Sequence, residues 1–499
     1  MKNKIVNICV FFIILISIGT VIIIRPLGDL DEIWNYNFAN NVFQNKIPYR
    51  DFNMVPTPLL PIVCSIFMRI FSNELIVMRI LAILLSTGIL FTSYKLLDLL
   101  KINKNLNYIT IIILFYLLKD LFTIDYNFAV LFLVLIIMYI EIKQYKKENI
   151  LLKLECKKDV LLGILAGLCI TLKQSTGLIV AVTLIGYKIL EIRNKKDFKE
   201  FIKIALMRTI GMLIPVIIMV IYLVYNNALN SFIDYAILGM KTFENKVEYI
   251  TLLLKQRNIL VQILSVLSPM IIIFSLIYGM YKKEKKLLII GVYSLSSFVV
   301  TFPISDRIHF LIGAMPSILG LAYIVNLLLE KIIKSDNIKI FSKYFFKSVI
   351  FIIVIYFGIT MVPKMQEYFK SNNSNINHFS YIKIESGLCT RINEIDKFIL
   401  EQDVPVYILD AEAAVYNIPI NKYYKNYDLL LKGNLGRDGE EGIIKTIQEE
   451  LNTNERIFLI KNEKYLQNWQ TPLKVINYVK NNLSKVNEIS IYDVYINKN

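Results

Sequence analysis

The sequence has 499 residues and a formal net charge of +16; 55% of its residues are hydrophobic and only 19% are charged. An average soluble domain has roughly 25% charged residues, so this composition excludes an ordinary soluble fold and predicts a polytopic membrane protein. Five cysteines without paired spacing and only two histidines argue against a disulfide framework and a zinc or multi-histidine site. We therefore expect neither a disulfide framework nor a metal site built from cysteines or histidines.

The first apolar segment, residues 5–24, contains no charge and has about the length that crosses a hydrocarbon core. Lys2 and Lys4 precede it, as in a signal peptide. The apolar run is longer than a typical signal-peptide core, however, and no small-x-small cleavage site follows before Arg25. We interpret it as an uncleaved transmembrane helix. Including this one, the eleven predicted spans are 5–24, 75–97, 107–122, 126–142, 159–173, 177–192, 204–225, 259–281, 287–303, 308–329 and 345–363.

Lysine and arginine predict the side of the membrane on which each connecting segment lies. With eleven spans and a cytoplasmic N-terminus, the inner segments hold 26 Lys and Arg in 71 residues and the outer segments hold 11 in 98. The density differs more than threefold, as the positive-inside rule expects for a protein of the cytoplasmic membrane. Residues 58–71 form a short apolar run that begins with prolines. If this run crossed the membrane, the later lysine clusters would lie outside the cytoplasm. We expect this run to lie at the interface or inside the protein. Topology thus explains the basic runs, and no nucleic-acid partner is predicted.

Residues 364–499 differ abruptly in composition from the transmembrane part, residues 1–363. The odd number of spans places this C-terminal domain outside the cytoplasm. Short apolar or alternating runs predict strands at Val404–Asp410, Arg456–Lys461 and Glu488–Ile496, and helical patterns cover Gly439–Leu451 and Thr471–Leu483. This alternation of strands and helices predicts a small α/β domain, so the fold class is mainly α, polytopic, with a C-terminal α/β domain.

The first outer loop, residues 25–74, has the most candidate functional residues. Asp29, Asp31 and Glu32 follow the first predicted helix directly, and polar groups that a membrane protein keeps near one surface are candidates for function. If a helix covers 31–43, however, Asp29 is placed to cap it and the other two carboxylates lie in its first turn. N-capping and compensation of the helix dipole would then explain all three. The residues alone leave both interpretations open.

Several short motifs in this loop and after it resemble membrane glycosyltransferases of the GT-C class. The Asp-Glu pair resembles that of protein O-mannosyltransferases, and the loop, with its aromatic helix and its Pro48-Tyr-Arg-Asp51 turn, is similar to that of bacterial aminoarabinose transferases of lipid A. The order continues with Met78-Arg-Ile80, Asp125 and Leu172-Lys-Gln174. The stretch Val55-Pro-Thr-Pro58 departs from the usual His-Pro-Pro or Lys-Pro-Pro, and the Trp-Trp-Asp motif of oligosaccharyltransferases is missing from the sequence. The acceptor class therefore stays open.

The resemblance implies a GT-C architecture and an inverting enzyme that transfers a sugar from a polyprenyl-phosphate donor to a hydroxyl at the outer face of the membrane. Because the carboxylate cluster is small and the enzymes that the chain resembles need no metal, we expect no metal and no cofactor. The resemblance also implies that Asp31 is the general base and Glu32 its orienting neighbour or substitute. The lipid phosphate needs cationic partners at the same face. The candidates for that role are Arg50, Arg79, Lys173, Arg307 and His309, and the acceptor-site candidates are Asp29, Asp51 and Tyr49.

Other interpretations of these residues and of the chain remain open. Each cation is also explained as a snorkelling residue or a topology anchor, Asp51 as a partner of Arg50, Asp125 as a helix cap and His309 as a hydrogen-bonded structural residue. For the whole chain, the alternatives are a transporter or flippase of lipid-linked sugars and a non-catalytic scaffold whose C-terminal domain binds a partner. Transporters usually have inverted repeats and polar groups near the midplane, whereas here the sequence has no repeat and its polar residues gather at one face.

Overall fold

The computed structural model describes residues 2–28, 30–148, 152–244, 246–332, 336–370, 374–453, 455–467 and 471–497. The chain divides into two compact units. The first unit comprises Met1–Ile24, Ile80–Ile218 and Val247–Lys370, and the second comprises Arg25–Arg79, Met219–Lys246 and Ser371–Asn499. The first outer loop of the predicted topology and the C-terminal residues therefore fold together in one unit.

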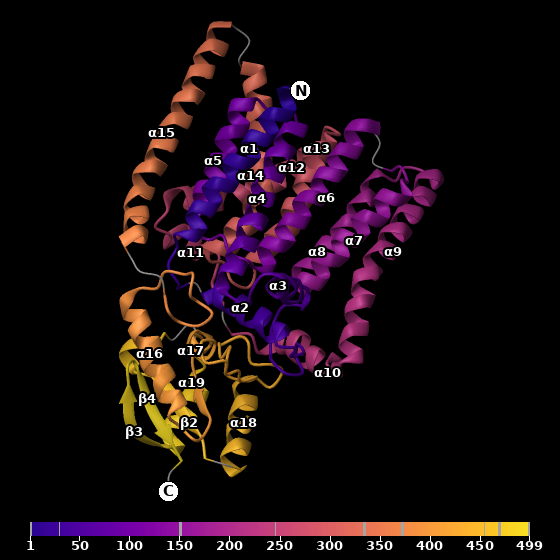
Figure 1. Ribbon diagram of the computed structural model, residues 1–499. Helices are drawn as coiled ribbons and strands as arrows, with labels where there is room; N and C mark the ends of the chain where they lie inside the picture. Colours follow the sequence, from indigo (N-terminus) through magenta and orange to yellow (C-terminus); the bar gives the residue numbers. More distant parts are fainter. Residues whose placement is uncertain are drawn as a thin grey trace. The chain divides into compact units, whose positions relative to one another are not determined.

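The first unit is built from helices (Figure 1). Most of them are apolar along most of their length. Its helices, two of which extend into the second unit, are α1 (Lys2–Ile23), α4 (Leu75–Leu99), α5 (Lys104–Leu118), α6 (Tyr126–Glu148), α7 (Cys156–Leu172), α8 (Gln174–Gly186), α9 (Lys195–Tyr225), α11 (Ile250–Leu254), α12 (Ile259–Tyr281), α13 (Lys285–Phe298), α14 (Arg307–Ile332) and α15 (Asp336–Lys370).

Each of the eleven predicted spans coincides with a helix of the first unit, but length supports fewer spans than eleven. In the described part of the chain, seven helices are long and apolar enough to cross a membrane: α1, α4, α6, α9, α12, α14 and α15. The other four, α5, α7, α8 and α13, have 15, 17, 13 and 14 residues. Two of these continue as 3-10 helices, α8 into η1 (Tyr187–Glu191) and α13 into η4 (Val299–Thr301), which lengthens both helical segments. The protein is a multi-pass membrane protein.

Glycines allow α7 and α9 to approach each other closely. A Cβ atom on Gly163 of α7 would lie 2.1 Å from the carbonyl oxygen of Arg208, and one on Gly211 of α9 would lie 2.2 Å from that of Val160. Apolar helices gain no hydrophobic free energy by leaving lipid for each other, so their association depends on close packing of this kind. These glycines therefore fix the spacing of the two helices.

A buried ion-pair network joins α6, α7, α8, η1 and α9 of the first unit. Arg208 on α9 donates to Glu141 on α6 at 2.6 Å and to Asp159 on α7 at 2.9 Å. It also donates to the carbonyl of Leu184 on α8 at 2.6 Å, and Lys188 of η1 lies 3.5 Å from Glu141. Two positive and two negative side chains thus compensate one another where isolated charges would be costly.

The second unit combines short helices with a small sheet. Its helices are α2 (Leu30–Phe43), α3 (Leu59–Ile70), α10 (Leu229–Phe232), η2 (Ile233–Ile237), η3 (Leu238–Thr242), α16 (Ser386–Leu400), α17 (Ala413–Asn417), α18 (Gly439–Thr453), η5 (Glu463–Tyr465) and α19 (Leu473–Asn482). Its strands are β1 (Val406–Ile408), β2 (Ile457–Lys461), β3 (Ser484–Ile489) and β4 (Tyr492–Ile496).

The four strands form one mixed sheet in the order β1-β2-β4-β3 (Figure 1). β1 and β2 are parallel, with Tyr407 opposite Phe458, and α18 lies between them in the chain, as the alternation of strands and helices predicted. β4 is antiparallel to both of its neighbours. The small C-terminal α/β fold is therefore confirmed.

The prediction of a single strand over Glu488–Ile496 is wrong. The segment is a hairpin in which Ile489 pairs with Tyr492 across a two-residue turn. Ser490 in that turn has a left-handed φ of 53°. Such turns usually carry Gly or Asn, and a serine between alternating apolar residues gave no signal that the strand would reverse.

Two apolar clusters hold the second unit together. One lies between the sheet and the helices α18 and α19, and its fully buried members include Leu430, Phe458 and Val479. The other packs the first loop against residues 219–246. In it, the rings of Tyr49 and Phe232 pack edge to face, with their centroids 5.1 Å apart. The loop is thus a packed part of the fold.

Candidate active site

A buried ion pair fixes the start of α2. Arg79, in the first turns of α4, donates from Nε to Oε1 of Glu32 and from Nη2 to Oε2, both at 2.9 Å. Both side chains are almost fully buried. The guanidinium also donates to the backbone carbonyl of Arg25, and at 3.3 Å to that of Pro26. Arg79 therefore holds both the Glu32 carboxylate and the chain that leads out of α1.

Asp31 lies beside this pair in the first turn of α2 and is only partly buried. The carboxylate of Glu32 is held at both oxygens by Arg79, whereas Asp31 is at an accessible position on the same turn. The Asn35 side chain donates to the Asp31 backbone carbonyl at 2.8 Å and so stabilises this turn. Asp29, predicted as a cap or an acceptor-site carboxylate, lies outside the described residues.

The turn after α2 contains the other predicted residues of this loop. Arg50 donates to both oxygens of Asp51, at 2.9 and 2.8 Å, and Asp51 also accepts from the backbone N–H of Ile47 at 2.7 Å. The Arg50 guanidinium beside Asp51 holds the pKa of that carboxyl below its ordinary value. The ion pair between Arg50 and Asp51, which the sequence offered as the alternative to an acceptor-site role for Asp51, is therefore present. Tyr49 is fully buried and donates its hydroxyl to the carbonyl of Pro56 at 2.6 Å, which favours a structural role.

A second group of polar residues gathers in the first unit where α7 meets α8. Lys173 has an extended backbone and links these two helices. Its Nζ donates to Oδ1 of Asn127 at 2.7 Å. Asp125 accepts from the backbone N–H of Asn127 at 2.7 Å, so it caps the start of α6. The carboxylates of Asp125 and Asp306 are the main negative charges acting on Lys173. The lysine thus lies in a buried polar cluster with a compensating charge.

His309 and Arg307 lie at the start of α14. Asp306 accepts from the backbone N–H of His309 at 2.9 Å and from its ring Nδ1 at 2.8 Å, which caps the helix and orients the imidazole. Arg307 donates from Nη2 to the carbonyl of Leu117 at 3.3 Å. Its Nε is buried and, among the residues that the structure describes, has no hydrogen-bond partner. A buried guanidinium N–H in this state can donate to an anionic ligand.

The structure thus brings the predicted residues together in three groups. Glu32 and Arg79 form one, Arg50 and Asp51 form the second, and Lys173 shares the third with Asp306 and His309 through Asp125. The network around Arg208 was not predicted, although a charged residue inside a long apolar run, as in α9, is a recognisable signal. The part that residues 219–246 play in the second unit was not predicted either, because their short helices have no marked periodicity.

Comparison with solved structures identifies the fold. ArnT from Cupriavidus metallidurans, in a structure bound to undecaprenyl phosphate, matches with a TM-score of 0.57 and 12% sequence identity over 98% of both chains. The apo structure of the same protein matches with a TM-score of 0.56 over the same share. The archaeal oligosaccharyltransferase AglB from Archaeoglobus fulgidus matches with a TM-score of 0.51 and 12% identity, over 92% of this chain and 70% of AglB. These proteins are GT-C glycosyltransferases.

This chain has the GT-C fold. No protein-family model and no curated protein matches the sequence, so at this identity the likeness is one of fold. The resemblance inferred from the first loop is therefore confirmed for the architecture. The match to ArnT covers nearly all residues of each protein, so the likeness of fold extends along nearly the whole chain.

Proposed function

We propose that this protein is an inverting glycosyltransferase that moves a sugar from a polyprenyl-phosphate donor to a hydroxyl acceptor at the outer face of the membrane. The observation that carries the proposal is the GT-C fold, shared over 98% of both chains with a protein solved in complex with undecaprenyl phosphate. AglB, which is similar over a smaller share of its length, was solved with a dolichol-phosphate. Both ligands are polyprenyl phosphates, which supports this class of lipid carrier.

Transfer requires one bond to form and one to break at the anomeric carbon. The acceptor hydroxyl oxygen attacks that carbon, and the bond from the carbon to the phosphate oxygen breaks, so that the lipid phosphate leaves with the electron pair. The hydroxyl proton passes to a carboxylate, and this is the role of Asp31. Its partial exposure on the first turn of α2 supports this assignment.

Glu32 and Arg79 are positioning residues in this proposal. Arg79 donates to both oxygens of Glu32, so that carboxylate is engaged in the ion pair. The pair instead fixes the turn that carries Asp31. Arg79 has its guanidinium directed at Glu32 and at two backbone carbonyls, so we assign it to this structural task and remove it from the phosphate-binding candidates.

The remaining candidates for binding the donor phosphate are Lys173, Arg307 and His309, with Arg50 as a further one. Arg307 is favoured because its buried Nε retains an N–H for an anion. Lys173 and His309 share a polar cluster with the carboxylates of Asp125 and Asp306. Arg50 is the least favoured, because Asp51 engages two of its nitrogens.

The experiment that tests this function uses the purified full chain in proteoliposomes with a panel of undecaprenyl-phosphate sugars and an extract of cell-envelope acceptors. Release of undecaprenyl phosphate, measured by mass spectrometry, reports transfer whatever the acceptor is. We expect release that depends on the protein. Movement of intact donor across the bilayer without release would identify a flippase, and neither activity would favour the scaffold.

A further inference from the structure

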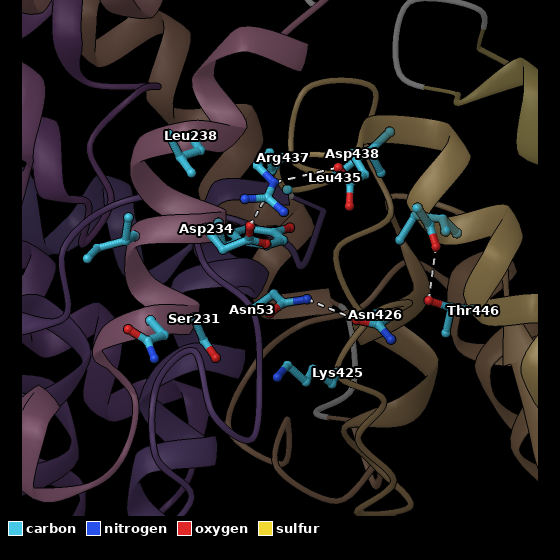
Figure 2. A pocket seen from close by; sticks show the side chains of 16 residues that line it. Asn53, Ser231, Asp234, Leu238, Lys425, Asn426, Leu435, Arg437, Asp438 and Thr446 are labelled. Carbon is cyan, nitrogen blue, oxygen red and sulfur yellow. Dashed lines mark hydrogen bonds and ion pairs between the residues drawn. The ribbon is translucent and has the colours of Figure 1, made fainter.

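The second unit contains an open cavity of about 560 Å³ that the catalytic proposal does not use. It is lined by residues from the first loop, from 230–238 and from 425–446, and all of them belong to the second unit. Its volume lies in the range of about 300–1,000 Å³ that is usual for small-molecule sites. Figure 2 shows that the labelled polar side chains converge on the cavity from these three stretches of chain.

The wall of this cavity is held together by specific contacts. Gly436 has a left-handed φ of 76° and allows the backbone to pass close to Gly239, where an added Cβ would lie 3.1 Å from the Cα of Gly436. The hydroxyl of Thr242 donates to the carbonyl of Gly436 at 2.7 Å, and the Tyr235 hydroxyl donates to the carbonyl of Asn434. Two segments nearly 200 residues apart in sequence are thus joined tightly beside the cavity.

The charges that line the cavity balance. The guanidinium of Arg437 lies 3.3 Å from Asp234 and 3.6 Å from Asp438 (Figure 2). Lys425 supplies the second positive charge and donates to the carbonyl of Arg50 at 2.8 Å. Two cations and two carboxylates give a formal charge of zero, so the cavity has no surplus charge for a phosphate. Charged groups at its wall also make it unsuitable for a lipid tail.

Amide and hydroxyl groups also line the cavity, beside apolar side chains such as those of Leu238 and Leu435. The side-chain amide of Asn53 donates to the side-chain oxygen of Asn426 at 3.1 Å. The side-chain oxygen of Asn53 can still accept a hydrogen bond, and the side-chain NH₂ of Asn426 can still donate. Thr446 donates to the carbonyl of Gly442 at 3.0 Å, and its oxygen can still accept. A ligand that presents many groups able both to donate and to accept matches this lining, and adjacent hydroxyls on a sugar ring have that property.

We propose that this cavity binds an electrically neutral, hydroxyl-rich saccharide, the glycan part of the acceptor. The carboxylates of Asp234 and Asp438 accept from sugar hydroxyls, and Arg437 and the two asparagine amides bind the remaining oxygens. Assignment as the acceptor rests on the glycosyl transfer proposed above, whereas saccharide binding does not. Binding here would select the acceptor by its glycan and orient it in the same unit that carries Asp31.

The test measures binding of the full chain, in lipid nanodiscs, to an array of neutral, acidic and phosphorylated short oligosaccharides together with serine- and threonine-containing peptides. We expect saturable binding to neutral oligosaccharides. Asp234→Ala and Asn426→Ala should each weaken that binding by about tenfold or more, because each removes a hydrogen-bonding side chain from the lining.

Glu244→Ala is the matched control. Glu244 also belongs to the 219–246 segment, is exposed and pairs with a basic residue of the C-terminal part, Lys432, at 3.8 Å, but it does not line the cavity. Binding by this variant should equal that of the unaltered protein. The unfolding temperature of each variant distinguishes loss of binding from loss of fold, and protection of 425–446 from hydrogen exchange by the bound oligosaccharide gives a second readout without mutation.

The proposal is overturned if no neutral oligosaccharide binds, if phosphorylated glycans or peptides bind in preference, or if both cavity variants bind normally. The test distinguishes failure of the saccharide-binding proposal from failure of the glycosyltransferase proposal. Asp31→Asn should retain saccharide binding while transfer is lost. Normal binding without any transfer would remove the catalytic function and leave the saccharide site intact.

Discussion

The buried pair of Glu32 and Arg79 has a positioning role in the proposed mechanism, and neither side chain takes part in the reaction. Removing one member of a buried, hydrogen-bonded ion pair leaves the other charge uncompensated and costs about 3–5 kcal/mol of stability. We expect Arg79→Met to lower the unfolding temperature of the purified protein in detergent and to reduce transfer. The exposed pair of Arg50 and Asp51 provides the control, since Arg50→Met should leave the unfolding temperature unchanged. Equal effects of the two substitutions would contradict the positioning role.

Asp396 on α16 gives a test of electrostatics away from the site. Burial raises the pKa of its carboxyl to about 7. Its Oδ1 has no hydrogen-bond partner within the described ranges. Because the folded-state pKa is above the ordinary value, the contribution of Asp396 to stability is fully present below about pH 4 and is lost as the pH rises to about 7.

Asp396→Asn should therefore raise the unfolding temperature at pH 8 and change it little at pH 4. Thermal unfolding of the full chain in detergent across this pH range measures the difference. A difference that is constant with pH would show that the carboxyl ionises at its ordinary pKa.

At the scale of elements, the close approach of α7 and α9 depends on Gly163. An alanine there would place its Cβ against the backbone of Arg208, so the helices must separate, at a cost of about 1–3 kcal/mol. Gly186→Ala is the matched control, because a Cβ there meets no atom within 4 Å. We expect Gly163→Ala to lower the unfolding temperature clearly and Gly186→Ala to leave it equal or slightly higher. The reverse order would contradict the packing.

Elements with a strong local pattern were predictable from sequence, and elements fixed by tertiary contacts were not. The apolar runs located every long helix, and the carboxylates after the first helix pointed to the turn that Arg79 holds. The hairpin at Ser490 was missed because its turn has no distinctive residue. The cavity was missed because Asp234 and Arg437 lie far apart in sequence, and only folding brings them together.

At the scale of the whole molecule, the lysine asymmetry predicts that the C-terminal end lies outside the cytoplasm. A reporter enzyme that is active only outside the cytoplasm, fused after residue 499, should be active, and a reporter active only in the cytoplasm should be silent at the same position. The opposite pair of results would mean that the number of spans is even, and would place the proposed site on the wrong side for an outer-face transferase.

In the proposed mechanism, Asp31 accepts the proton of the attacking hydroxyl. Asp31→Asn preserves the size of the side chain and one accepting oxygen but removes its basicity. Release of undecaprenyl phosphate from the donor in proteoliposomes measures its effect, with Glu74→Gln, a carboxylate change elsewhere in the same unit, as the control. We predict a fall of about 10²–10⁴-fold for Asp31→Asn with donor binding retained, and no comparable fall for the control. Near-normal release of undecaprenyl phosphate by Asp31→Asn would show that Asp31 is not the general base.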